Sequence, residues 1–378
     1  MKSIKLVFTF LVAIMGSVLL AHAQKNILIV VTNNKEVQAH MAGKDTIIAG
    51  GYELSEVSQA YEVFTKSGFN VDFMSPKGGM TYYEPEEKMS DFNKAFIKNA
   101  EVMEKLENTL AAEAINANEY EAIYFAGGKT MWDFPESEAL AKLIIEMYED
   151  KKVVGAVCHG PAAFVNIKLS DGSSLIAGKK ISAFTDMEEK LFSKTAKFLP
   201  FMLQEKLTSL GANFQEAPAM FDQAVVDGQL VTGQNPMSTY SVAEEMVKLL
   251  GKTPPQRPWV DVAYTLEVIK AIVLEDEETA KKFMKKHADE AQLEQGLFEQ
   301  YAIYGNAGHL GEVVKSKGFQ LLKFAAVQFP ESAQVHEALA KVYHQQGENE
   351  KAIASIKKSL SLNPDSESAT KFLKEIEG

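Results

Sequence analysis

The chain has 378 residues, of which 46% are hydrophobic, and it carries a formal net charge of −12 at pH 7. This length accommodates one large domain and a smaller one. The acidic charge argues against nucleic acid or an anionic membrane surface as the partner.

Residues 1–23 have the features of a secretory signal peptide. The start is basic, residues 6–20 are apolar, and Ala21-His22-Ala23 supplies a small-x-small close. The apolar run is short for a membrane-spanning helix, and no later stretch is long and apolar enough to span a bilayer. We therefore expect cleavage before Gln24 and export across the inner membrane of a Gram-negative bacterium. The mature protein would be periplasmic or extracellular, without a membrane partner.

Strands and helices alternate along residues 24–251, which we predict to form one domain. The strands are apolar throughout, as is typical of central strands in parallel sheets. The predicted strands cover residues 26–32, 71–74, 122–125, 153–157, 181–184 and 229–236, the last including a turn. The predicted helices cover residues 52–67, 101–114, 137–148, 201–211 and 239–250. This alternation predicts a doubly wound α/β fold with a mostly parallel sheet, a flavodoxin-like sandwich.

A proline-rich linker is predicted at residues 252–260, because Gly251 and three prolines (Pro254, Pro255 and Pro258) lie within eight residues. From residue 261 to 378 only helical periodicity is found, which predicts a small all-α domain.

One tetratricopeptide-like repeat is predicted at about residues 331–364. Pro330 and Pro364 lie 34 residues apart, which is the period of that repeat. Between them the sequence matches the repeat at Leu339, Ala340, Tyr343, Gly347, Ala352 and Ile356. The preceding unit is degenerate, with Gly318 in the place of Ala352. A generic helical hairpin is the alternative, and a true repeat predicts a docking surface for a protein partner.

The single cysteine of the chain lies where a buried strand turns into a predicted helix. Residues 153–157 form the strand, and Cys158, His159, Gly160 and Pro161 follow. A strand that turns sharply into a helix exposes the turn residue, as in a nucleophile elbow. The helix N-terminus is expected to favour the thiolate. The alternative is a small buried cysteine packed under a helix.

Further polar groups follow the predicted strands at the edge where parallel sheets bind ligands. Gly127 and Gly128 allow close backbone approach and can direct an N–H at an oxyanion, with the N–H of His159 as a second donor. Glu56 and the acidic pair Glu188 and Glu189 offer carboxylates that could hold a proton or orient an imidazole. Spacing alone does not select among them, and all three could be solvated helix residues.

Neither a metal nor a cofactor is expected. The remaining histidines lack metal-ligand spacing; those after the signal peptide are His40, His287, His309, His336 and His344. No phosphate-binding loop or nucleotide fingerprint is present.

Five motifs, in order over about residues 26–250, resemble those of the ThiJ/PfpI family in the class I glutamine-amidotransferase-like superfamily. They are Gly51-Tyr52-Glu53-Leu54-Ser55-Glu56, Phe125-Ala126-Gly127-Gly128 with Met131-Trp132-Asp133-Phe134-Pro135, Ala156-Val157-Cys158-His159-Gly160-Pro161, Phe184-Thr185-Asp186-Met187-Glu188-Glu189, and Thr232-Gly233-Gln234-Asn235-Pro236. The Trp-Asp-Phe motif and the acidic segment resemble the heat-shock chaperone/glyoxalase III branch.

The resemblance implies roles for the site residues. Cys158 would be the nucleophile, His159 the general base, and Glu189 the triad acid, with Glu188 as the runner-up. Glu56 would hydrogen-bond the cysteine. Two features depart from the branch. Residues 127–131 are one residue shorter than its usual loop and lack its histidine. The predicted signal peptide is also unusual, because members of the branch are thought of as cytoplasmic.

The implied activity is that of a cofactor-independent glyoxalase III of the D-lactate dehydratase type. It would convert methylglyoxal or a related 2-oxoaldehyde to a 2-hydroxy acid through a Cys158 hemithioacetal, with protein deglycation as a possible extension. The alternatives are a stress-related holding chaperone or redox sensor, and a cysteine-dependent amidase or peptidase. Dimers are frequent in this family, so a homodimer stays open.

Overall fold

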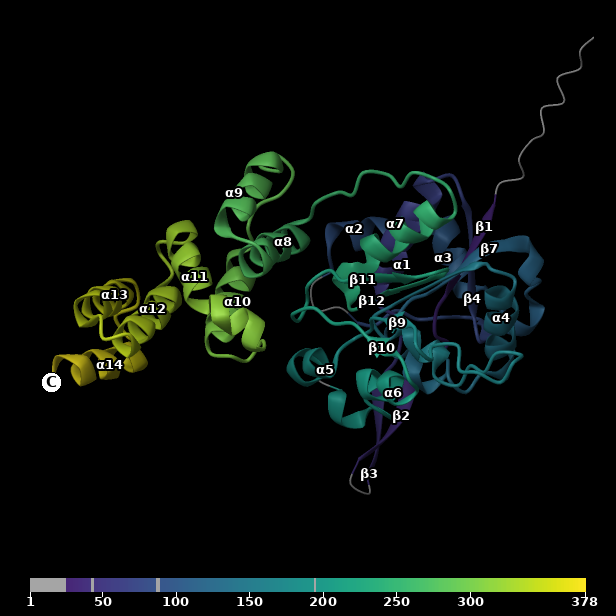
Figure 1. Cartoon of the computed structure of the whole chain (residues 1–378), viewed down its shortest axis with the longest axis horizontal. Coiled ribbons are helices and arrows are strands. Elements are labelled where there is room, and N and C mark those ends of the chain that lie inside the picture. Colours follow the sequence, from purple (N-terminus) through teal and green to yellow (C-terminus); the bar gives the residue numbers. More distant parts are fainter. Residues whose placement is uncertain (1–24, 42–43, 86–88, 194) are drawn as a thin grey trace, which may run out of the picture.

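The computed structural model describes residues 25–41, 44–85, 89–193 and 195–378 (Figure 1). The predicted signal peptide lies outside these residues. Within them, no helix combines the length and the apolarity needed to cross a membrane.

The core of the first part is an eight-stranded sheet with the order β11-β12-β8-β7-β1-β4-β6-β5. Its strands are β1 (Asn26–Val30), β4 (Asn70–Ser75), β5 (Lys77–Gly79), β6 (Thr109–Ala111), β7 (Tyr120–Phe125), β8 (Val153–Val157), β11 (Ala224–Asp227) and β12 (Leu230–Gly233). All neighbouring pairs from β12 to β6 are parallel, and only β11 and β5 are antiparallel to their neighbours. The predicted doubly wound, mostly parallel fold is confirmed.

Helices cover both faces of this sheet, which explains why the strands are apolar throughout. They are α1 (Leu54–Lys66), α2 (Asp91–Ile97), α3 (Ala100–Glu107), α4 (Glu138–Glu149), α5 (Asp186–Phe192), α6 (Leu203–Ser209) and α7 (Thr239–Leu249). Ile27 and Ile29 of β1 pack with the side of α1, α3 and α7, and Leu28 and Val30 pack with the side of α4 and α6. Each such buried aliphatic side chain contributes about 1.5–3 kcal/mol.

Two predicted elements lose a substantial part of their length in the structure. The helix expected over residues 101–114 ends at Glu107, because Thr109–Ala111 pairs with β4 and β5 as an inner strand. The strand expected over residues 181–184 is reduced to β9 (Lys180–Ile181), which pairs with β10 (Asn213–Phe214). In both cases strand pairing between distant segments decides the local conformation.

An antiparallel hairpin of β2 (Glu36–Met41) and β3 (Lys44–Ala49) was not predicted, and it extends below the sheet in Figure 1. Single turns of 3₁₀ helix complete the first part. They are η1 (Ala112–Ala114), η2 (Ala117–Glu119), η3 (Thr130–Trp132), η4 (Gly160–Phe164), η5 (Ala196–Phe198) and η6 (Pro236–Ser238).

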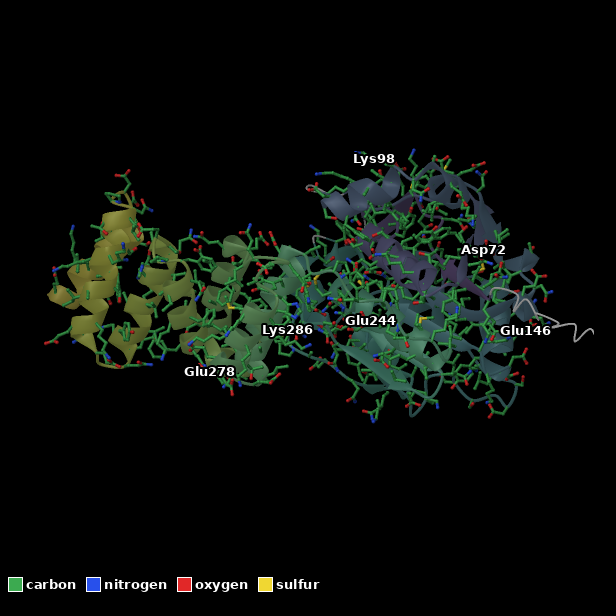
Figure 2. All side chains as sticks on the ribbon, turned by 90° about the horizontal axis from the view of Figure 1, so that it is seen from above. Asp72, Lys98, Glu146, Glu244, Glu278 and Lys286 are labelled. Atoms are coloured by element: carbon green, nitrogen blue, oxygen red, sulfur yellow. The ribbon has the colours of Figure 1, made fainter. Side chains whose placement is uncertain are left out.

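The second part is all-helical and extends as an arm from one side of the α/β part (Figure 1). Its helices are α8 (Asp261–Leu274), α9 (Glu277–Lys286), α10 (Gln295–Asn306), α11 (Glu312–Gln328), α12 (Ala333–Gln345), α13 (Asn349–Leu362) and α14 (Glu367–Glu377). The predicted repeat corresponds to α12 and α13, in which Ala340 and Ile356 pack together with Ala369 of α14. Charged side chains such as Asp72, Lys98 and Glu278 lie on the outside of both parts (Figure 2).

The degenerate unit has a steric reason for its glycine. A Cβ atom added at Gly318 of α11 would lie 2.4 Å from the Cα of Asn306 in α10. Real Cβ atoms do not approach that closely, so the two helices can pack at this distance only with glycine. The departure from the repeat pattern at this position therefore reflects closer helix packing.

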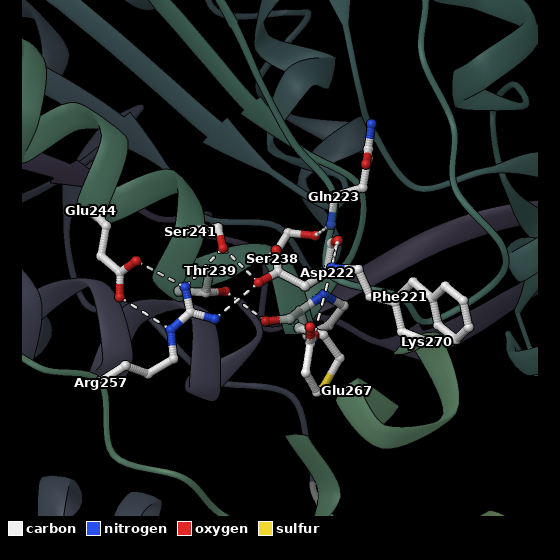
Figure 3. A network of polar contacts seen from close by, with 12 residues as sticks. Phe221, Asp222, Gln223, Ser238, Thr239, Ser241, Glu244, Arg257, Glu267 and Lys270 are labelled. Atoms are coloured by element: carbon white, nitrogen blue, oxygen red, sulfur yellow. Dashed lines mark hydrogen bonds and ion pairs between the residues drawn. The ribbon is translucent and has the colours of Figure 1, made fainter. Parts of the chain in front are cut away.

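The linker is tied to the α/β part by one arginine. Arg257 lies 2.9 Å from Asp222 and 2.9 Å from Glu244 of α7, and it donates to Ser241 (Figure 3). In addition, Ala219 and Phe221 of the α/β part are buried in the same apolar cluster as α8 and α10. Because the two parts share this cluster, the domain boundaries at 251 and 261 stay a prediction.

Candidate active site

Cys158 lies at the end of β8 in a backbone conformation that non-glycine residues seldom adopt. Its φ is +57°, which costs about 1–2 kcal/mol for an L-residue. Two hydrogen bonds hold it: its N–H donates to Gly233 O (3.0 Å), and its C=O accepts from Phe184 N (2.9 Å). The turn directs the thiol beyond the carboxyl end of the sheet, which is the geometry of a nucleophile elbow.

The segment after Cys158 differs from the predicted helix. It is the five-residue 3₁₀ turn η4, in which a Cβ atom at Gly160 would lie 2.3 Å from Phe125 O. Such a short turn supplies little of the dipole that was expected to favour the thiolate. The pKa of Cys158 is raised, first by burial and then by the Glu56 carboxylate. The long helix that was predicted to favour the thiolate is therefore replaced by this short turn.

Cys158, His159 and Glu189 form a hydrogen-bonded row. The Sγ of Cys158 lies 3.3 Å from His159 Nδ1, and His159 Nε2 lies 2.8 Å from Glu189 Oε2. If Glu189 accepts from Nε2–H, Nδ1 is left as the acceptor for the thiol proton. The ring of Phe184 packs against the imidazole with centroids 4.8 Å apart. This is the geometry required of a nucleophile, a base and a group that orients the base.

Glu189 is the orienting carboxylate in this row. Burial alone raises its pKa, but the hydrogen bond and the charge of His159 outweigh burial and leave the pKa below its ordinary value. Glu189 is therefore ionised at neutral pH. It lies in the first turn of α5, directly after Glu188.

Glu188, the alternative triad acid, faces away from His159. Its carboxylate accepts hydrogen bonds from Thr185, Met220, Gln234 and Asn235 at 2.7–3.1 Å. Burial raises its pKa, and these hydrogen bonds act in the opposite direction. Of the two neighbouring glutamates, the structure thus places Glu189 in the site and Glu188 in a buried structural network.

Glu56 reaches the site from α1 and is completely buried. Its Oε2 accepts from the N–H of Gly127, and no protein group within the described ranges is hydrogen-bonded to its Oε1. Burial, followed by the charge of Glu53, raises its pKa well above the ordinary value, while interaction with Cys158 acts in the opposite direction. The charges of Glu56 and Cys158 thus oppose one another, and a proton on either group relieves this repulsion. The alternative of a solvated surface glutamate is wrong here.

The glycine pair is required sterically. A Cβ atom at Gly127 would lie 2.8 Å from His159 N and 2.9 Å from Glu56 Oε2, and Gly128 has a φ of +97°. The N–H of Gly127 is already bonded to Glu56, so it is not free for an oxyanion as expected. The N–H groups of Gly128 and His159 have no acceptor in the described part of the chain and are the available donors.

A pocket of about 490 Å³ opens over the thiol. Residues from distant segments line it: Ala49, Glu53, Glu84, Pro85, Gly128, Lys129, Cys158, His159, Phe184, Phe192, Ser193, Thr195 and Pro236. Lys129, in the shortened loop that lacks the family's histidine, forms an ion pair with Glu84 at 2.7 Å. The sequence showed that the loop at Lys129 departs from the family pattern. Nothing in it indicated that Glu84, 45 residues away, would pair with Lys129 in the pocket.

The described residues contain no group of three or more His, Cys, Asp or Glu side chains that could hold a metal ion. Three histidines outside the site have a hydrogen-bond partner nearby in the chain: His287 lies 2.9 Å from Glu290, His336 lies 2.9 Å from Pro330 O, and His344 lies 3.0 Å from Asn349. The ring of His309 packs against that of Tyr304.

A sequence model of the DJ-1/PfpI family matches residues 46–249, more than half of the chain. A tetratricopeptide-repeat model matches residues 333–366, which include α12 and α13. The first match contains every residue of the row around Cys158, and the second overlaps the predicted repeat over residues 333–364.

Similar proteins carry glyoxalase names. The chain is 39% identical over 153 residues to the probable glutathione-independent glyoxalase hsp3103 of Schizosaccharomyces pombe, which covers 38% of this chain and 59% of that protein. It is 33% identical over 223 residues to the glutathione-independent glyoxalase hsp3102 of the same yeast, covering 55% and 90%. The structure of glyoxalase III from Candida albicans has a TM-score of 0.52 and 28% identity, and the alignment covers 60% of this chain and 97% of that one.

Proposed function

The chain belongs to the DJ-1/PfpI family, and from this premise we propose that it is a glutathione-independent glyoxalase of the glyoxalase III type. Its substrate would be methylglyoxal or a related 2-oxoaldehyde, and its product a 2-hydroxy acid. The observation that carries the proposal is the row Cys158–His159–Glu189 at the base of a pocket. The names of the similar proteins supply the reaction class.

In the first step, His159 Nδ1 takes the thiol proton as the sulfur attacks the aldehyde carbon. A raised pKa of Cys158 favours this coupled transfer over a preformed thiolate. The N–H groups of Gly128 and His159 stabilise the oxyanion, which then takes the proton back from His159. The result is a hemithioacetal on Cys158, with His159 neutral again.

In the second step, His159 removes the proton from C1, which leaves an enediolate bound to the sulfur. Return of this proton to C2, with transfer of the hydroxyl proton from the C1 oxygen to the C2 oxygen, forms a thioester of the 2-hydroxy acid. No external oxidant is needed because C1 is oxidised while C2 is reduced. Water then hydrolyses the thioester, which releases the acid and the thiol. Glu189 holds the imidazole in place and stabilises its charged form.

The direct test is to incubate the purified protein with methylglyoxal, without glutathione or added metal, and to measure D-lactate chirally. Wild type should form D-lactate, and Cys158→Ala should form none. A folded wild type that forms no lactate would remove the proposal. Deglycation would then be tested with glycated peptides, and the amidase alternative by release of amine from amide substrates.

A second proposal concerns a protein partner for the helical part. A groove of about 660 Å³ lies between α10, α11 and α12, with Asn306, Lys315, Glu337 and Lys341 among its lining residues. Together with the tetratricopeptide match, this groove supports docking of a protein and hence a holding or stress-related role. A Cys158→Ala variant that forms no lactate but still suppresses aggregation of a client protein would separate such a role from turnover.

We also propose export after cleavage before Gln24, on the basis of residues 1–23. Sequencing the N-terminus of protein recovered from the periplasm or the medium tests this. Whether the chain forms a homodimer is tested by light scattering.

A further inference from the structure

We infer that Tyr301, in the helical part, is a positioning residue for the His159–Glu189 pair. It acts through segment 219–223 of the α/β part and through Glu188. The inference rests on the proposed function only in giving that pair a catalytic role. None of the residues that line the pocket over Cys158 comes from the helical part, so any influence of that part on the reaction must be indirect.

The first contact joins α10 to segment 219–223. The hydroxyl of Tyr301 donates to Ala219 O (3.1 Å), and its ring stacks on Phe221 with centroids 5.6 Å apart and 11° between the planes. Both rings are buried in the cluster that the two parts share. Tyr301 therefore holds the segment on both sides of Met220.

The second contact joins Met220 to Glu188. Met220 has a φ of +64°, which is unusual for a non-glycine residue and requires support from its surroundings. In this conformation its N–H donates to Glu188 Oε1 at 2.7 Å. The positions of Ala219 and Phe221, which Tyr301 holds, thus determine where this donor points.

The third contact is the start of α5. Glu188 forms a capping box with Thr185, since each accepts a hydrogen bond from the other's backbone N–H. Glu188 and Glu189 are adjacent on this first turn, with one carboxylate in the buried network and the other on His159. A shift of Glu188 must therefore move Glu189 relative to the imidazole.

Segment 219–223 is also held at Asp222, by one residue of the linker and one of α8. Asp222 accepts from Arg257 at 2.9 Å, and its C=O accepts from Lys270 of α8 at 3.1 Å (Figure 3). Residues 257, 270 and 301 thus contact Ala219, Phe221 and Asp222. The fold gives the helical part a continuous, buried connection to the orienting carboxylate.

The experiment compares Tyr301→Phe and Tyr301→Ala with wild type in the full chain. Tyr304→Phe is the matched control, because Tyr304 lies on the same helix but is 44% exposed and packs on His309. Two quantities are measured: kcat and KM for methylglyoxal, and the pH profile of Cys158 alkylation by iodoacetamide. The alkylation reports on Cys158 alone because the chain has one cysteine.

We expect kcat to fall about tenfold in Tyr301→Ala and about threefold in Tyr301→Phe, with KM nearly unchanged, because a base displaced by a fraction of an ångström loses efficiency. The pH profile of Cys158 alkylation should shift more in Tyr301→Ala than in Tyr301→Phe. Tyr304→Phe should match wild type in both measurements. A merely structural role would lower thermal stability without shifting the alkylation profile of the folded protein.

A folded Tyr301→Ala variant that has the kcat and the alkylation profile of wild type would overturn the inference. If that variant does not fold, Tyr301→Phe decides alone, and a Tyr301→Phe variant indistinguishable from wild type would overturn it. If wild type forms no lactate, the proposed function fails, but the alkylation profiles still test the connection from Tyr301 to the Cys158–His159 pair.

Discussion

The α/β part and the helical part bury different kinds of side chain. In the described structure, Glu56, Asp133, Glu188 and Glu189 are buried carboxyl groups, and all four lie in the α/β part. The buried polar residues of the helical part are Thr265, His287, Ser332 and Ser359, none of which is a carboxylic acid. Buried carboxyl groups are costly unless they are paired or protonated, and two of these four, Glu56 and Glu189, lie beside Cys158 or His159, so the part that holds the site carries this cost.

The largest effect should come from Cys158→Ala. Removing the nucleophile should lower methylglyoxal turnover by about 10⁴-fold or more, because no other step replaces the covalent intermediate. The thermal midpoint should change little in comparison, and chiral lactate analysis beside a melting curve checks both. Turnover within tenfold of wild type would mean that the reaction does not pass through Cys158.

The neighbouring glutamates provide a matched pair within one helix turn. Glu189→Gln should lower kcat by about 10²-fold, because the neutral amide no longer stabilises the protonated imidazole. Glu188→Gln should lower kcat less and should mainly lower the free energy of unfolding, by about 1–3 kcal/mol, because buried donors lose a charged acceptor while the amide oxygen can still accept from the N–H of Met220.

Denaturant unfolding and kinetics of both variants check this division. The opposite result, with Glu188→Gln the more damaging to kcat at equal stability, would mean that Glu189 does not orient the base. For Glu189 the folded pKa is lowered, so its contribution to stability is present above the unfolded value and is lost as the pH falls through the folded value.

Asp133 should make the α/β part less stable as the pH rises. Burial raises its pKa from 3.8 to about 7, against hydrogen bonds from Thr32 and Asn33. The folded state therefore binds the proton more tightly than the unfolded chain, and stability falls between about pH 4 and pH 7. Relative to Asp133→Asn, wild type should lose about 2–3 kcal/mol between pH 5 and pH 8.

Urea unfolding at the two pH values checks this prediction. A stability difference between wild type and Asp133→Asn that is the same at pH 5 and pH 8 would contradict the raised pKa.

Two glycines of the helical part should respond in opposite directions. Gly318→Ala places a Cβ atom against Asn306 and should destabilise the protein by about 1–3 kcal/mol. Gly296→Ala, in α10, meets nothing within 4 Å and should stabilise it by about 0.5 kcal/mol through the lower entropy of the unfolded chain. Calorimetry distinguishes the two, and a neutral Gly318→Ala would show that α10 and α11 can separate without cost.

Much of the fold could be predicted from local patterns. Uninterrupted apolar strands, helical spacing and glycine or proline stops predicted the parallel sheet and its helices, since burial on both faces leaves a clear mark in composition. The hairpin of β2 and β3, the strand β6 and the short turn η4 were not predicted. Their conformation depends on pairing and contacts with distant residues, such as the approach of Phe125 O to Gly160.

The sequence by itself determined the residue types of the site: one cysteine followed by histidine, a glycine pair, an acidic pair after a strand, and a glutamate on the first helix. Only the tertiary structure decided that Glu189 and not Glu188 reaches His159, that Glu56 occupies the N–H of Gly127, and that Tyr301 contacts segment 219–223. The reason is physical. Composition and spacing act along the chain, whereas a pKa or a hydrogen bond depends on which distant atoms the folded chain brings within a few ångströms.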